Sequence, residues 1–511
     1  MTDTEYLETE YLEPRATDRS GGFDGAPPLA VDVAPLGALT GDRYLASLDD
    51  GRAVWLDGRQ IDSVAEHPAF APSVAEFARL LDLQHDPEYR ETLTVEDPAT
   101  GLRLGRGYHP PQTLDDLRAA RRGAAVWMRE SWGQHGRAPA FMASIAVGLY
   151  DFRHRLESNR AGFGAHAAAW YHYAAHRDLL LTHALGDPQI DRSADVVDHP
   201  DHALRILSED ANGIVVRGAK QLATLAPFAH EVLVYLSASF AQRGTEQFIV
   251  WFALPINAPG LHILCREPFG TSGHGHARPF ASRFDEQDAM LFFDDVQVPW
   301  ERVFLLHDGA LAREGLGRIT AWSQYIGQIR YQERLRTLLG VGTLIAEAIG
   351  VDQFRNIQEE LGELAGYVEI LDHFLAAGEA GAGRTDSGLL APGPTPAAAI
   401  WAAAVSGHAV DIVRRIGQSG TLMQPTENDL ANPTLRTFLD RYMHGKDIGA
   451  AAKSRLFRLA WELTSDSFGQ RQHLYESVHR GDLARNRINL LRRHDQTEVR
   501  ERIQRLISRP L

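Results

Sequence analysis

Cysteine is almost absent from this chain of 511 residues, because Cys265 is its one cysteine. A single thiol excludes an internal disulfide, a zinc finger and an iron–sulfur cluster held by several cysteines. A chain of this length buries enough apolar surface to fold without such cross-links. The lack of disulfides is typical of the reducing cytoplasm, which is the location that we expect.

The motifs that hold nucleotide phosphates are also missing. A Rossmann fingerprint needs Gly-x-Gly-x-x-Gly directly after a strand. The nearest match, Gly340-Val341-Gly342, lacks the third glycine and lies within a helical pattern, so we assign it to helix packing. The chain has neither a Walker motif nor the Gly-x-Ser-x-Gly elbow of α/β-hydrolases. The sequence therefore predicts no nicotinamide-binding domain, no ATP site and no serine-hydrolase site.

An excess of positive charge and long apolar runs are absent as well. Lys and Arg number 52 against 67 Asp and Glu, which gives a formal net charge of −15. An acidic protein repels phosphate backbones, so nucleic acid is not an expected partner. No run of about 18 apolar residues predicts a membrane span, and residues 1–28 lack the apolar core of a signal peptide. Residues 1–38 are polar and acidic, and we expect a disordered arm there.

The periodicity of apolar residues divides the rest of the chain into three predicted domains. Residues 39–179 have mainly helical spacing, with a small hairpin at the Asp57-Gly58 turn. Residues 180–305 contain short β-rich runs between turns, as in a small barrel or sandwich. Residues 306–511 are helical again and are typical of a helix bundle. Its long amphipathic segments are residues 319–349, 354–380, 397–418 and 446–465.

Several histidines have the spacing of metal ligands but lack the residues that would complete a site. His172 and His176 are four residues apart on a predicted helix, yet Tyr173 stands where a zincin has glutamate. His274 and His276 lie in a glycine-rich loop, which makes a poor preformed metal cage. The better interpretation of that loop is contact with a substrate, and we predict no metal site.

Three other segments could carry chemistry, but each has a structural alternative. Arg137, in Gly136-Arg137-Ala138-Pro139, could be a surface arginine in a turn. His183, in Thr182-His183-Ala184, could be a core histidine with satisfied hydrogen bonds. The charged segment 282–289 could be an ion-pair turn at a domain edge. No one of these segments indicates a function by itself.

Taken together and in order, the segments resemble one family. The chain resembles, over about residues 40–480, the oxygenase component of the 4-hydroxyphenylacetate 3-hydroxylase family of two-component flavin monooxygenases. The motifs that carry the resemblance are Thr40-Gly41 with Tyr44-Leu45 and Ser47-Leu48, Gly51-Arg52, His67-Pro68-Ala69-Phe70, Gly136-Arg137 with Pro139, Thr182-His183-Ala184, Gly218-Ala219-Lys220 with Ala223-Thr224, Ser282-Arg283-Phe284-Asp285-Glu286 with Asp288-Ala289, Val298-Pro299-Trp300-Glu301, Phe354-Arg355 with Gln358 and Leu361-Gly362-Glu363, Asn432-Pro433, Phe468-Gly469 with Arg471, and Leu474-Tyr475-Glu476.

This resemblance implies an α+β fold like that of acyl-CoA dehydrogenases, with an N-terminal helical domain, a middle antiparallel β-barrel domain and a C-terminal four-helix bundle. It also implies a homodimer or homotetramer. FAD would arrive in its reduced form from a separate NAD(P)H:flavin reductase, so the missing nicotinamide motif is expected. In the family, reduced flavin and O₂ form a C4a-hydroperoxide that hydroxylates a phenol, while the protein orients the reactants and excludes water.

The resemblance further implies roles for single residues. Arg137 and His183 match the residues that contact the substrate hydroxyl, and Thr224 matches a threonine near flavin N5; these three are the expected catalytic residues. Histidine ordinarily titrates near neutrality, so His183 is expected to accept or share the phenolic proton.

The other expected contacts follow from the same motifs. Besides Arg137 and His183, the expected substrate contacts are Phe141, Ser237, His274 and His276. Besides His183 and Thr224, the expected FAD contacts are Ala184, Leu185, Gly186, Gln189, Ile190, Asp191, Arg192, Phe468, Gly469, Gln470 and Arg471.

The chain departs from the family pattern at positions near the expected substrate. Phe141 stands where the family has a tyrosine that would hold the phenol oxygen. Leu225-Ala226 replaces Asn-Ser after the key threonine, and the loop at 272–279 carries histidines and an arginine in place of the family sequence. We therefore expect a tailored aromatic substrate, such as a specialised-metabolite intermediate, rather than 4-hydroxyphenylacetate. His274, His276 and Arg278 could meet an anionic or carrier-bound group.

Three other functions stay open at this point. The loss of the tyrosine hydroxyl at Phe141 slightly favours N-hydroxylation of an arylamine, with the flavin retained. An acyl-CoA dehydrogenase-like oxidation would need a catalytic carboxylate, for which Glu363 and Glu427 are available. A scaffold without activity would require Arg137, His183 and Thr224 to be retained by accident.

Overall fold

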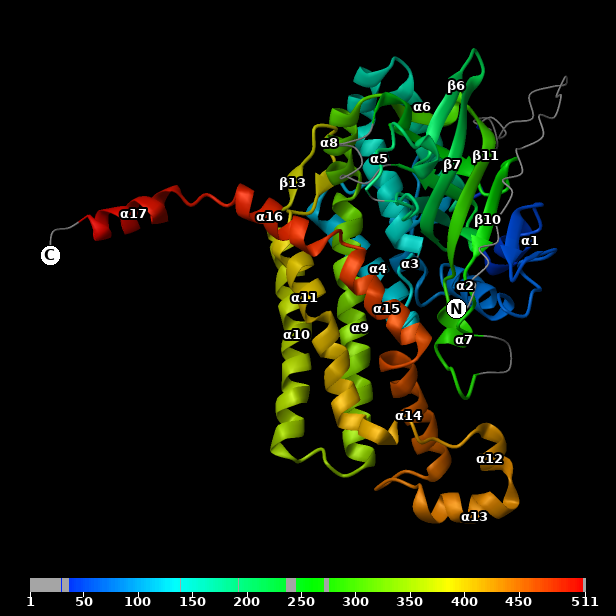
Figure 1. The fold of residues 1–511 in the computed structure, drawn as a ribbon, viewed down its shortest axis with the longest axis vertical. Helices are drawn as coiled ribbons and strands as arrows, with labels where there is room; N and C mark the ends of the chain where they lie inside the picture. The colour runs from blue at the N-terminus through cyan, green and yellow to red at the C-terminus, as the bar shows by residue number, and fades with distance from the viewer. Residues whose placement is uncertain are drawn as a thin grey trace, which may run out of the picture.

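The computed structural model describes Leu29 and residues 36–137, 139–191, 193–235, 245–270 and 275–508. Helices that follow the N-terminus lie beside a β region, and a stack of long helices stands next to both (Figure 1). Leu36 and Ala38, at the end of the expected arm, donate backbone hydrogen bonds to His176 and Arg103, so this end of the segment is attached to the helical region. The remainder of the arm lies almost entirely outside the described residues.

The first part of the chain is mainly helical, as its periodicity predicts. Helix α5 is apolar on nearly all sides and is buried between α6, α8 and α9, because every face of it meets another element. Asp57 and Gly58 both have positive φ and join β1 to β2, so the predicted hairpin is confirmed. The elements are α1 (Gly41–Ser47), β1 (Ala53–Leu56), β2 (Arg59–Gln60), α2 (Ala71–Asp82), α3 (Arg90–Leu93), β3 (Thr94–Glu96), β4 (Arg103–Gly105), α4 (Leu114–Glu130), α5 (Pro139–Asn159) and α6 (Phe163–Arg177).

Two sheets follow. One has six strands in the order β2-β1-β10-β11-β7-β6, and the other has four strands in the order β12-β9-β8-β5. Their strands, besides β1 and β2, are β5 (Leu181–Ala184), β6 (Arg205–Glu209), β7 (Gly213–Thr224), β8 (Glu231–Val234), β9 (Val250–Pro255), β10 (Leu261–Cys265), β11 (Asp288–Pro299) and β12 (Val303–Leu306). The short helix α7 (Ala281–Phe284) precedes β11.

The predicted antiparallel barrel is wrong in two respects. Among the described residues each sheet ends in two edge strands, so neither sheet closes into a barrel. Two of the pairings are parallel, β1 with β10 and β5 with β8. The sequence could not reveal the first of these pairings, because β1 comes from the helical region some 200 residues earlier.

Long helices form the last part of the fold, and they start and end within a few residues of the predicted segments. The central helix α9 packs against α4, α5, α10, α11 and α14, and its 28 residues make it about 42 Å long. The elements are α8 (Gly309–Ile319), α9 (Ala321–Ala348), α10 (Arg355–Ala380), β13 (Gly383–Arg384), β14 (Leu390–Ala391), α11 (Pro396–Gly417), α12 (Glu427–Ala431), α13 (Pro433–Tyr442), α14 (Ala450–Thr464), α15 (Ser467–Val478), α16 (Leu483–Arg493) and α17 (Thr497–Ile507). The domain boundaries read from the sequence stay a prediction.

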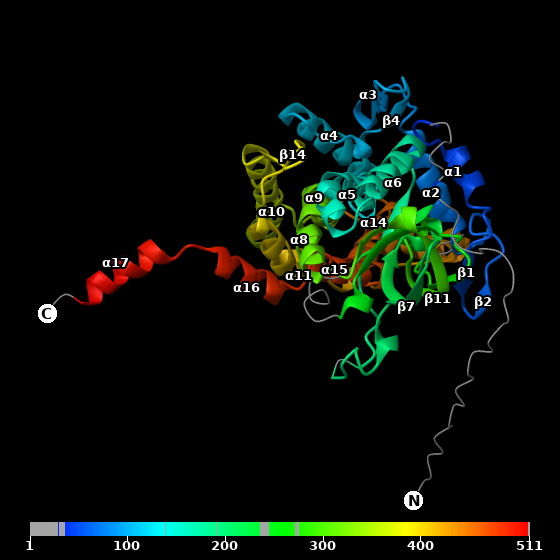
Figure 2. The same ribbon diagram turned by 90° about the horizontal axis from the view of Figure 1, so that it is seen from above.

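Helix α16 packs on α11, and α17 projects away from the body of the molecule in both views (Figures 1 and 2). One helix, Pro396–Gly420, is long and apolar enough to pass a length-and-composition test for a membrane span. This segment includes α11, which packs on α9, α14 and α15 and buries its apolar face there. Core helices of soluble proteins pass the same test, so the finding is weak evidence for a membrane.

Candidate active site

Arg137 lies in the turn before α5 and points its guanidinium into a buried polar cluster. The guanidinium carbon is 4.7 Å from the ring centroid of Phe141, one helical turn further on. Its Nη1 donates a hydrogen bond of 2.8 Å to the hydroxyl of Tyr475 on α15. Its Nε is buried and has no hydrogen-bond partner among the described residues. Arg137 is therefore a buried donor whose Nε has a bond left to make, not the surface arginine of a simple turn.

Two neighbouring features hold Arg137 in place. The carboxylate of Glu286 accepts hydrogen bonds from the backbone N–H groups of Gly136 and Arg137, at 2.8 and 2.6 Å. A side chain at Gly136 would lie 2.7 Å from the ring of Tyr475, so only glycine permits this approach. Segment 282–289 thus contains the ion-paired turn foreseen as its structural alternative, and it also orients the arginine.

His183 lies on β5 and faces the same cluster. Its side chain is buried, and its ring meets Phe141 edge to face, with centroids 6.2 Å apart. Its Nδ1 lies 2.6 Å from the hydroxyl oxygen of Tyr235. Burial and the positive charge of Arg137 hold the pKa of His183 well below its ordinary value. The expectation that His183 titrates near neutrality is therefore wrong, because the sequence does not show how deeply it is buried.

Thr224 ends β7 and belongs to a charged network. Its hydroxyl donates a 2.7 Å hydrogen bond to Asp288, and Arg471 binds the same carboxylate at 2.6 and 2.9 Å. Thr182, which precedes His183, donates a 2.5 Å hydrogen bond to the carbonyl of Thr224. This bond joins Thr224, the threonine expected near flavin N5, to β5, the strand that carries His183.

The segment after His183 is positioned by a fully buried lysine. Lys220 Nζ donates to Asp187 at 2.7 Å and to the carbonyl of Leu185 at 3.3 Å. Gly186 pairs with Gln221 in an isolated β-bridge. Ala184 is buried, whereas Gln189, Ile190 and Asp191 are exposed. Of the expected flavin contacts in this segment, Leu185 and Gly186 are thus tied to β7, the strand that carries Thr224, and so is the neighbouring Asp187.

The residues around Thr224 suit a flavin ring. Both side-chain amide atoms of Gln287 are buried without a hydrogen-bond partner among the described residues. Gln287 is close to Thr224 in the fold, because its carbonyl accepts from the N–H of Leu225. Leu222 in β7 has a positive φ of 59° and is 57% exposed, which is unusual for a large apolar side chain. Near Thr224 the fold thus has unpaired buried polar atoms and an uncovered apolar side chain, which would fit the edge and the face of an isoalloxazine.

The expected C-terminal contacts divide into two groups. Arg471 reaches the Thr224 network directly. Phe468 packs into the core of the helix stack, Gly469 lies against the backbone of Leu463, and Gln470 donates to the carbonyl of Thr464. These three residues support the turn that presents Arg471.

Other expected site residues are elsewhere or not described. His276 has Arg458, Glu427 and Arg455 as its charged neighbours, none of which belongs to the cluster around Arg137. Arg192, Ser237 and His274 lie outside the described residues. Glu363 is bonded to Tyr367 and His408 on the helix surface, and Glu427 is exposed at the start of α12, so neither carboxylate lies beside His183.

Sequence reasoning missed four residues of the cluster. Tyr235 bonds His183, and Tyr475 bonds Arg137. His479 stacks on Tyr475, with ring centroids 4.1 Å apart, and Gly327 on α9 faces both His479 and Phe141. Tyr475 stands in one of the matched motifs, which was its only signal. The other three come from separate elements that only the tertiary structure brings together.

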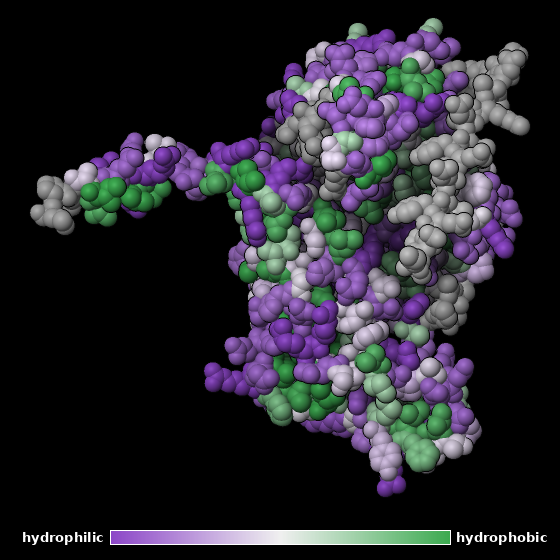
Figure 3. Space-filling model, viewed as in Figure 1, coloured by the Kyte–Doolittle hydropathy of each residue, from purple (hydrophilic) through white to green (hydrophobic). Residues whose placement is uncertain are grey.

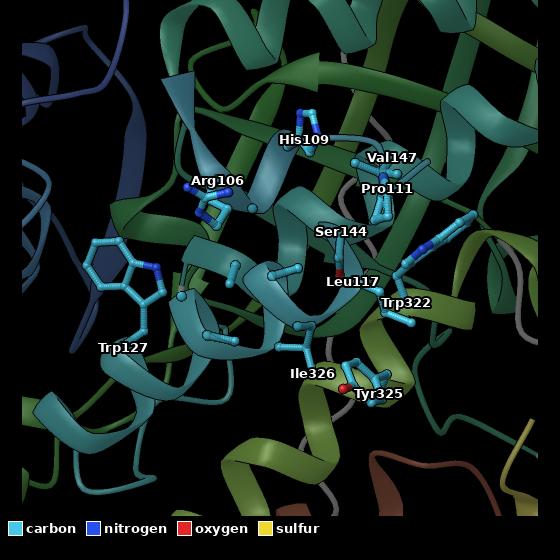
Figure 4. A pocket seen from close by; sticks show the side chains of 15 residues that line it. Arg106, His109, Pro111, Leu117, Trp127, Ser144, Val147, Trp322, Tyr325 and Ile326 are labelled. Carbon is cyan, nitrogen blue, oxygen red and sulfur yellow. The ribbon is translucent and has the colours of Figure 1, made fainter. Parts of the chain in front are cut away.

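A separate small cavity lies between α4, α5 and α9 (Figure 4). Trp127, Ser144, Trp322 and Tyr325 are among its walls, and its volume of about 20 Å³ is enough for roughly one water. It shares no lining residue with the cluster of Arg137, Phe141 and His183. We therefore treat it as a packing gap rather than as the active site.

Known protein families match this chain over most of its length. The models for the N-terminal and C-terminal parts of 4-hydroxyphenylacetate 3-hydroxylase match residues 40–305 and 318–508. The 4-hydroxyphenylacetate 3-monooxygenase oxygenase component of Thermus thermophilus is 33% identical over 482 residues, which are 93% of this chain and 98% of that protein.

Two other relatives carry names from specialised metabolism. A pyoverdin chromophore biosynthetic protein of Pseudomonas aeruginosa is 32% identical, over 89% of this chain and 92% of its own length. A monooxygenase of Streptomyces globisporus, named for a chlorinated 4-hydroxyphenyl amino acid on a peptidyl-carrier protein, is 30% identical, over 90% of this chain and 88% of its own length.

Solved structures agree with these matches. The oxygenase component of 4-hydroxyphenylacetate 3-monooxygenase in complex with FAD has a TM-score of 0.87 and 32% identity, and it covers 92% of this chain and 98% of that chain. An archaeal 4-hydroxybutyryl-CoA dehydratase from N. maritimus has a TM-score of 0.80 at 19% identity, covering 92% and 95%, and shows the fold alone. The fold is thus that of the oxygenase component, and the dehydratase shares it.

Proposed function

The chain belongs to the 4-hydroxyphenylacetate 3-hydroxylase family, and on that premise we propose that it hydroxylates a tailored phenol rather than 4-hydroxyphenylacetate. It is an FAD-dependent aromatic monooxygenase of the oxygenase-component type, which implies a separate reductase. Reduced FAD supplies the activation of O₂, and the chain's own residues bind and orient the substrate.

The observation that carries the substrate proposal is the wall formed by Arg137, Phe141 and His183. The family has a tyrosine at position 141, and here the phenyl ring of Phe141 contacts Arg137 and His183 without a hydroxyl. A binding site rejects ligands most strongly when a polar group is left unpaired. A substrate that binds against these three side chains therefore does not need a hydrogen bond from residue 141. The relatives named for a pyoverdin chromophore and for a carrier-bound amino acid support a specialised-metabolite phenol.

Roles for the remaining residues follow as proposals. Arg137 donates to the phenolic oxygen through its free Nε, and a fixed guanidinium stabilises negative charge there. His183 lies beside the flavin, and the hydroxyl of Thr224 lies near the reactive flavin edge. Residues 184–186, together with Arg471, would line the cofactor.

A second candidate reaction is N-hydroxylation of an arylamine. The missing hydroxyl at Phe141 supports it, because a contact specific for phenols is gone. The acyl-CoA dehydrogenase-like alternative has no such support, because Glu363 and Glu427 are exposed and distant in the fold from the buried histidine. We therefore retain the phenol as the first candidate and the arylamine as the second.

We also propose a cytoplasmic homo-oligomer in which the C-terminal helices contact a second copy. Helix α17 exposes Val499, Ile503, Leu506 and Ile507 along one face, and this apolar side is visible on the projecting tail (Figure 3). Residues 482–511 contain eight arginines against four acidic residues, whereas the whole chain carries −15. A basic, amphipathic tail complements the acidic surface of another copy of the same chain.

Turnover with FAD, NADH and a flavin reductase under ¹⁸O₂ tests the reaction class. The proposal predicts that substituted 4-hydroxyphenyl amino acids, free or carrier-bound, gain one ¹⁸O atom faster than 4-hydroxyphenylacetate does. Faster conversion of 4-hydroxyphenylacetate would contradict the substrate proposal. Label on the nitrogen of an arylamine, with phenols unreacted, would favour the second candidate.

A further inference from the structure

His479 shares the space in front of Phe141, although it comes from the far end of the chain. A Cβ atom placed on Gly327 of α9 would lie 3.9 Å from Nε2 of His479 and 3.9 Å from Cε2 of Phe141. Apart from α9's own nearby atoms, no other atom comes closer to that point, so the glycine leaves room for a methyl-sized group between the two rings. This Nε2 is buried and has no hydrogen-bond partner among the described residues.

The contacts of His479 determine which of its nitrogens carries the proton. Nδ1 lies 2.7 Å from the carbonyl oxygen of Tyr475. A carbonyl oxygen only accepts, so Nδ1 must be the donor and must carry a hydrogen. In a neutral imidazole the other nitrogen then has a free lone pair. Nε2 of His479 is therefore an acceptor that borders the space beside Gly327 and Phe141.

His183 has the opposite arrangement. Its Nδ1 lies 2.6 Å from the hydroxyl of Tyr235, and that nitrogen is the partner of the hydroxyl among the described residues. Both groups are buried, so the hydroxyl loses a hydrogen bond unless it donates to Nδ1. Nε2 of His183 then carries the hydrogen. Nε2 of His183 and Nε of Arg137 are then two donors on residues that contact the ring of Phe141.

We propose that His479 is a substrate-binding residue whose Nε2 accepts a hydrogen bond from the substrate hydroxyl, and that it replaces the polar group which Phe141 lacks. This inference rests on the proposed function. The phenolic oxygen accepts from Arg137 and His183, while the phenolic hydrogen points to His479. Tyr235 is a positioning residue, because it acts by fixing the proton of His183 on Nε2.

The surroundings of His479 make it a hydrogen-bond acceptor rather than a base. Burial and the charges of Arg480, Arg330 and Arg137 hold its pKa well below the ordinary value, although the bond to Tyr475 acts in the opposite direction. Glu476, the nearby carboxylate, is already paired with Arg330 and Arg480. A neutral imidazole in this setting keeps its lone pair available at neutral pH. The preferred ligand is thus a neutral phenol, which supplies both an acceptor and a donor.

The first test reads the tautomers directly. The FAD-loaded protein is labelled with ¹⁵N-histidine, and nitrogen–proton correlation spectra are assigned with His479→Phe and His183→Phe variants. The inference predicts the hydrogen on Nδ1 in His479 and on Nε2 in His183. In Tyr235→Phe the His183 spectrum should change while that of His479 does not. A hydrogen on Nε2 of His479 would overturn the proposal, whatever reaction the protein catalyses.

The second test uses two probes, 4-chlorophenol and 4-chloroanisole. In the anisole a methyl group replaces the hydroxyl hydrogen, so it cannot donate a hydrogen bond. One hydrogen bond of about 1 kcal/mol corresponds to roughly a fivefold preference for the phenol. We expect the FAD-loaded wild type to show this preference, His479→Phe to lose it, and the control His473→Phe, on the same helix, to keep it. A preference that survives in His479→Phe, or is absent from the wild type, contradicts the proposal.

Gly327→Ala provides an independent check of where the phenol binds. The methyl group would fill the space between Phe141 and His479, and alanine stabilises a helix by about 1 kcal/mol relative to glycine. We expect unchanged or raised thermal stability together with at least tenfold weaker binding of 4-chlorophenol. Unchanged binding would place the phenol elsewhere and overturn the proposal. Correct tautomers and phenol binding without any hydroxylation would instead count against the proposed function alone.

Discussion

Arg471 and Asp288 join helix α15 to the first residue of strand β11 through hydrogen bonds of 2.6 and 2.9 Å. The same carboxylate accepts a 2.7 Å bond from Thr224. Burial alone would raise the pKa of Asp288, but the charge and hydrogen bonds of Arg471 lower it far below the ordinary value. The pair therefore holds the expected flavin-edge threonine and ties the end of the chain to the β region.

Replacement of Asp288 by asparagine should lower the free energy of unfolding at pH 7 by about 3 kcal/mol, because the charge of Arg471 loses its main partner. The depressed pKa means that the stabilisation is present above pH 4 and is lost as the pH falls further. Urea unfolding from pH 3 to 8 should show a constant difference from the wild type that shrinks below about pH 4. Asp440→Asn removes an exposed pair with Arg436 and should cost less than about 1 kcal/mol. Equal losses in the two variants would refute this account.

Replacement of His135 by phenylalanine should stabilise the protein. His135 stacks on Phe77 with centroids 4.4 Å apart, and neither ring nitrogen has a partner among the described residues. Phenylalanine keeps the stacking and removes two unpaired buried polar atoms, worth about 1–3 kcal/mol.

This gain should depend on pH. Burial lowers the pKa of His135 to about 3, so between pH 6.5 and 3 the unfolded chain binds a proton that the folded chain does not. Wild-type stability then falls with acidification by up to about 1.4 kcal/mol per pH unit from this group, and His135→Phe removes that slope. A variant that is less stable, or whose slope is unchanged, would contradict the unpaired, neutral state of the buried His135 ring.

The bond between Arg137 and Tyr475 should affect how much oxidised flavin yields product. Tyr475→Phe removes the acceptor of Nη1, and we expect about a tenfold fall in hydroxylation because Arg137 is less well oriented. Arg137→Lys should cost more, since an ammonium cannot bind Tyr475 and a substrate oxygen in one plane. The control Tyr442→Phe changes an exposed tyrosine and should be neutral. Product and hydrogen peroxide are measured together, and an unaltered product yield in Tyr475→Phe would contradict the assignment.

The C-terminal helices should control assembly. Removal of residues 482–511 is expected to reduce the number of subunits per particle, measured by light scattering, because the apolar face of α17 would no longer cover another copy. Ile503→Arg with Ile507→Arg should act in the same direction without shortening the chain. The same number of subunits in the full chain and the truncated chain would contradict the proposed contact.

Local features of the fold were predictable from the sequence, whereas long-range ones were not. The long helices and the Asp57-Gly58 hairpin follow from apolar period and turn chemistry, which act over a few residues. The open sheets were not predicted, because β1 joins β10 from about 200 residues away. For the same reason only part of the site could be predicted. Motifs located Arg137, His183 and Thr224. Gly327 and His479 approach Phe141 only after α9 and α15 have packed.

Anaerobic mixing of the protein and reduced FAD with oxygenated buffer tests the central claim most directly. An aromatic monooxygenase must protect its reduced flavin from wasteful oxidation. The account predicts a distinct, oxygen-dependent absorbance transient near 380–390 nm before oxidised FAD appears, and faster decay of that transient with hydroxylated product when a suitable phenol is present. Direct reoxidation of the flavin with stoichiometric hydrogen peroxide and no transient, with or without phenols, would contradict it.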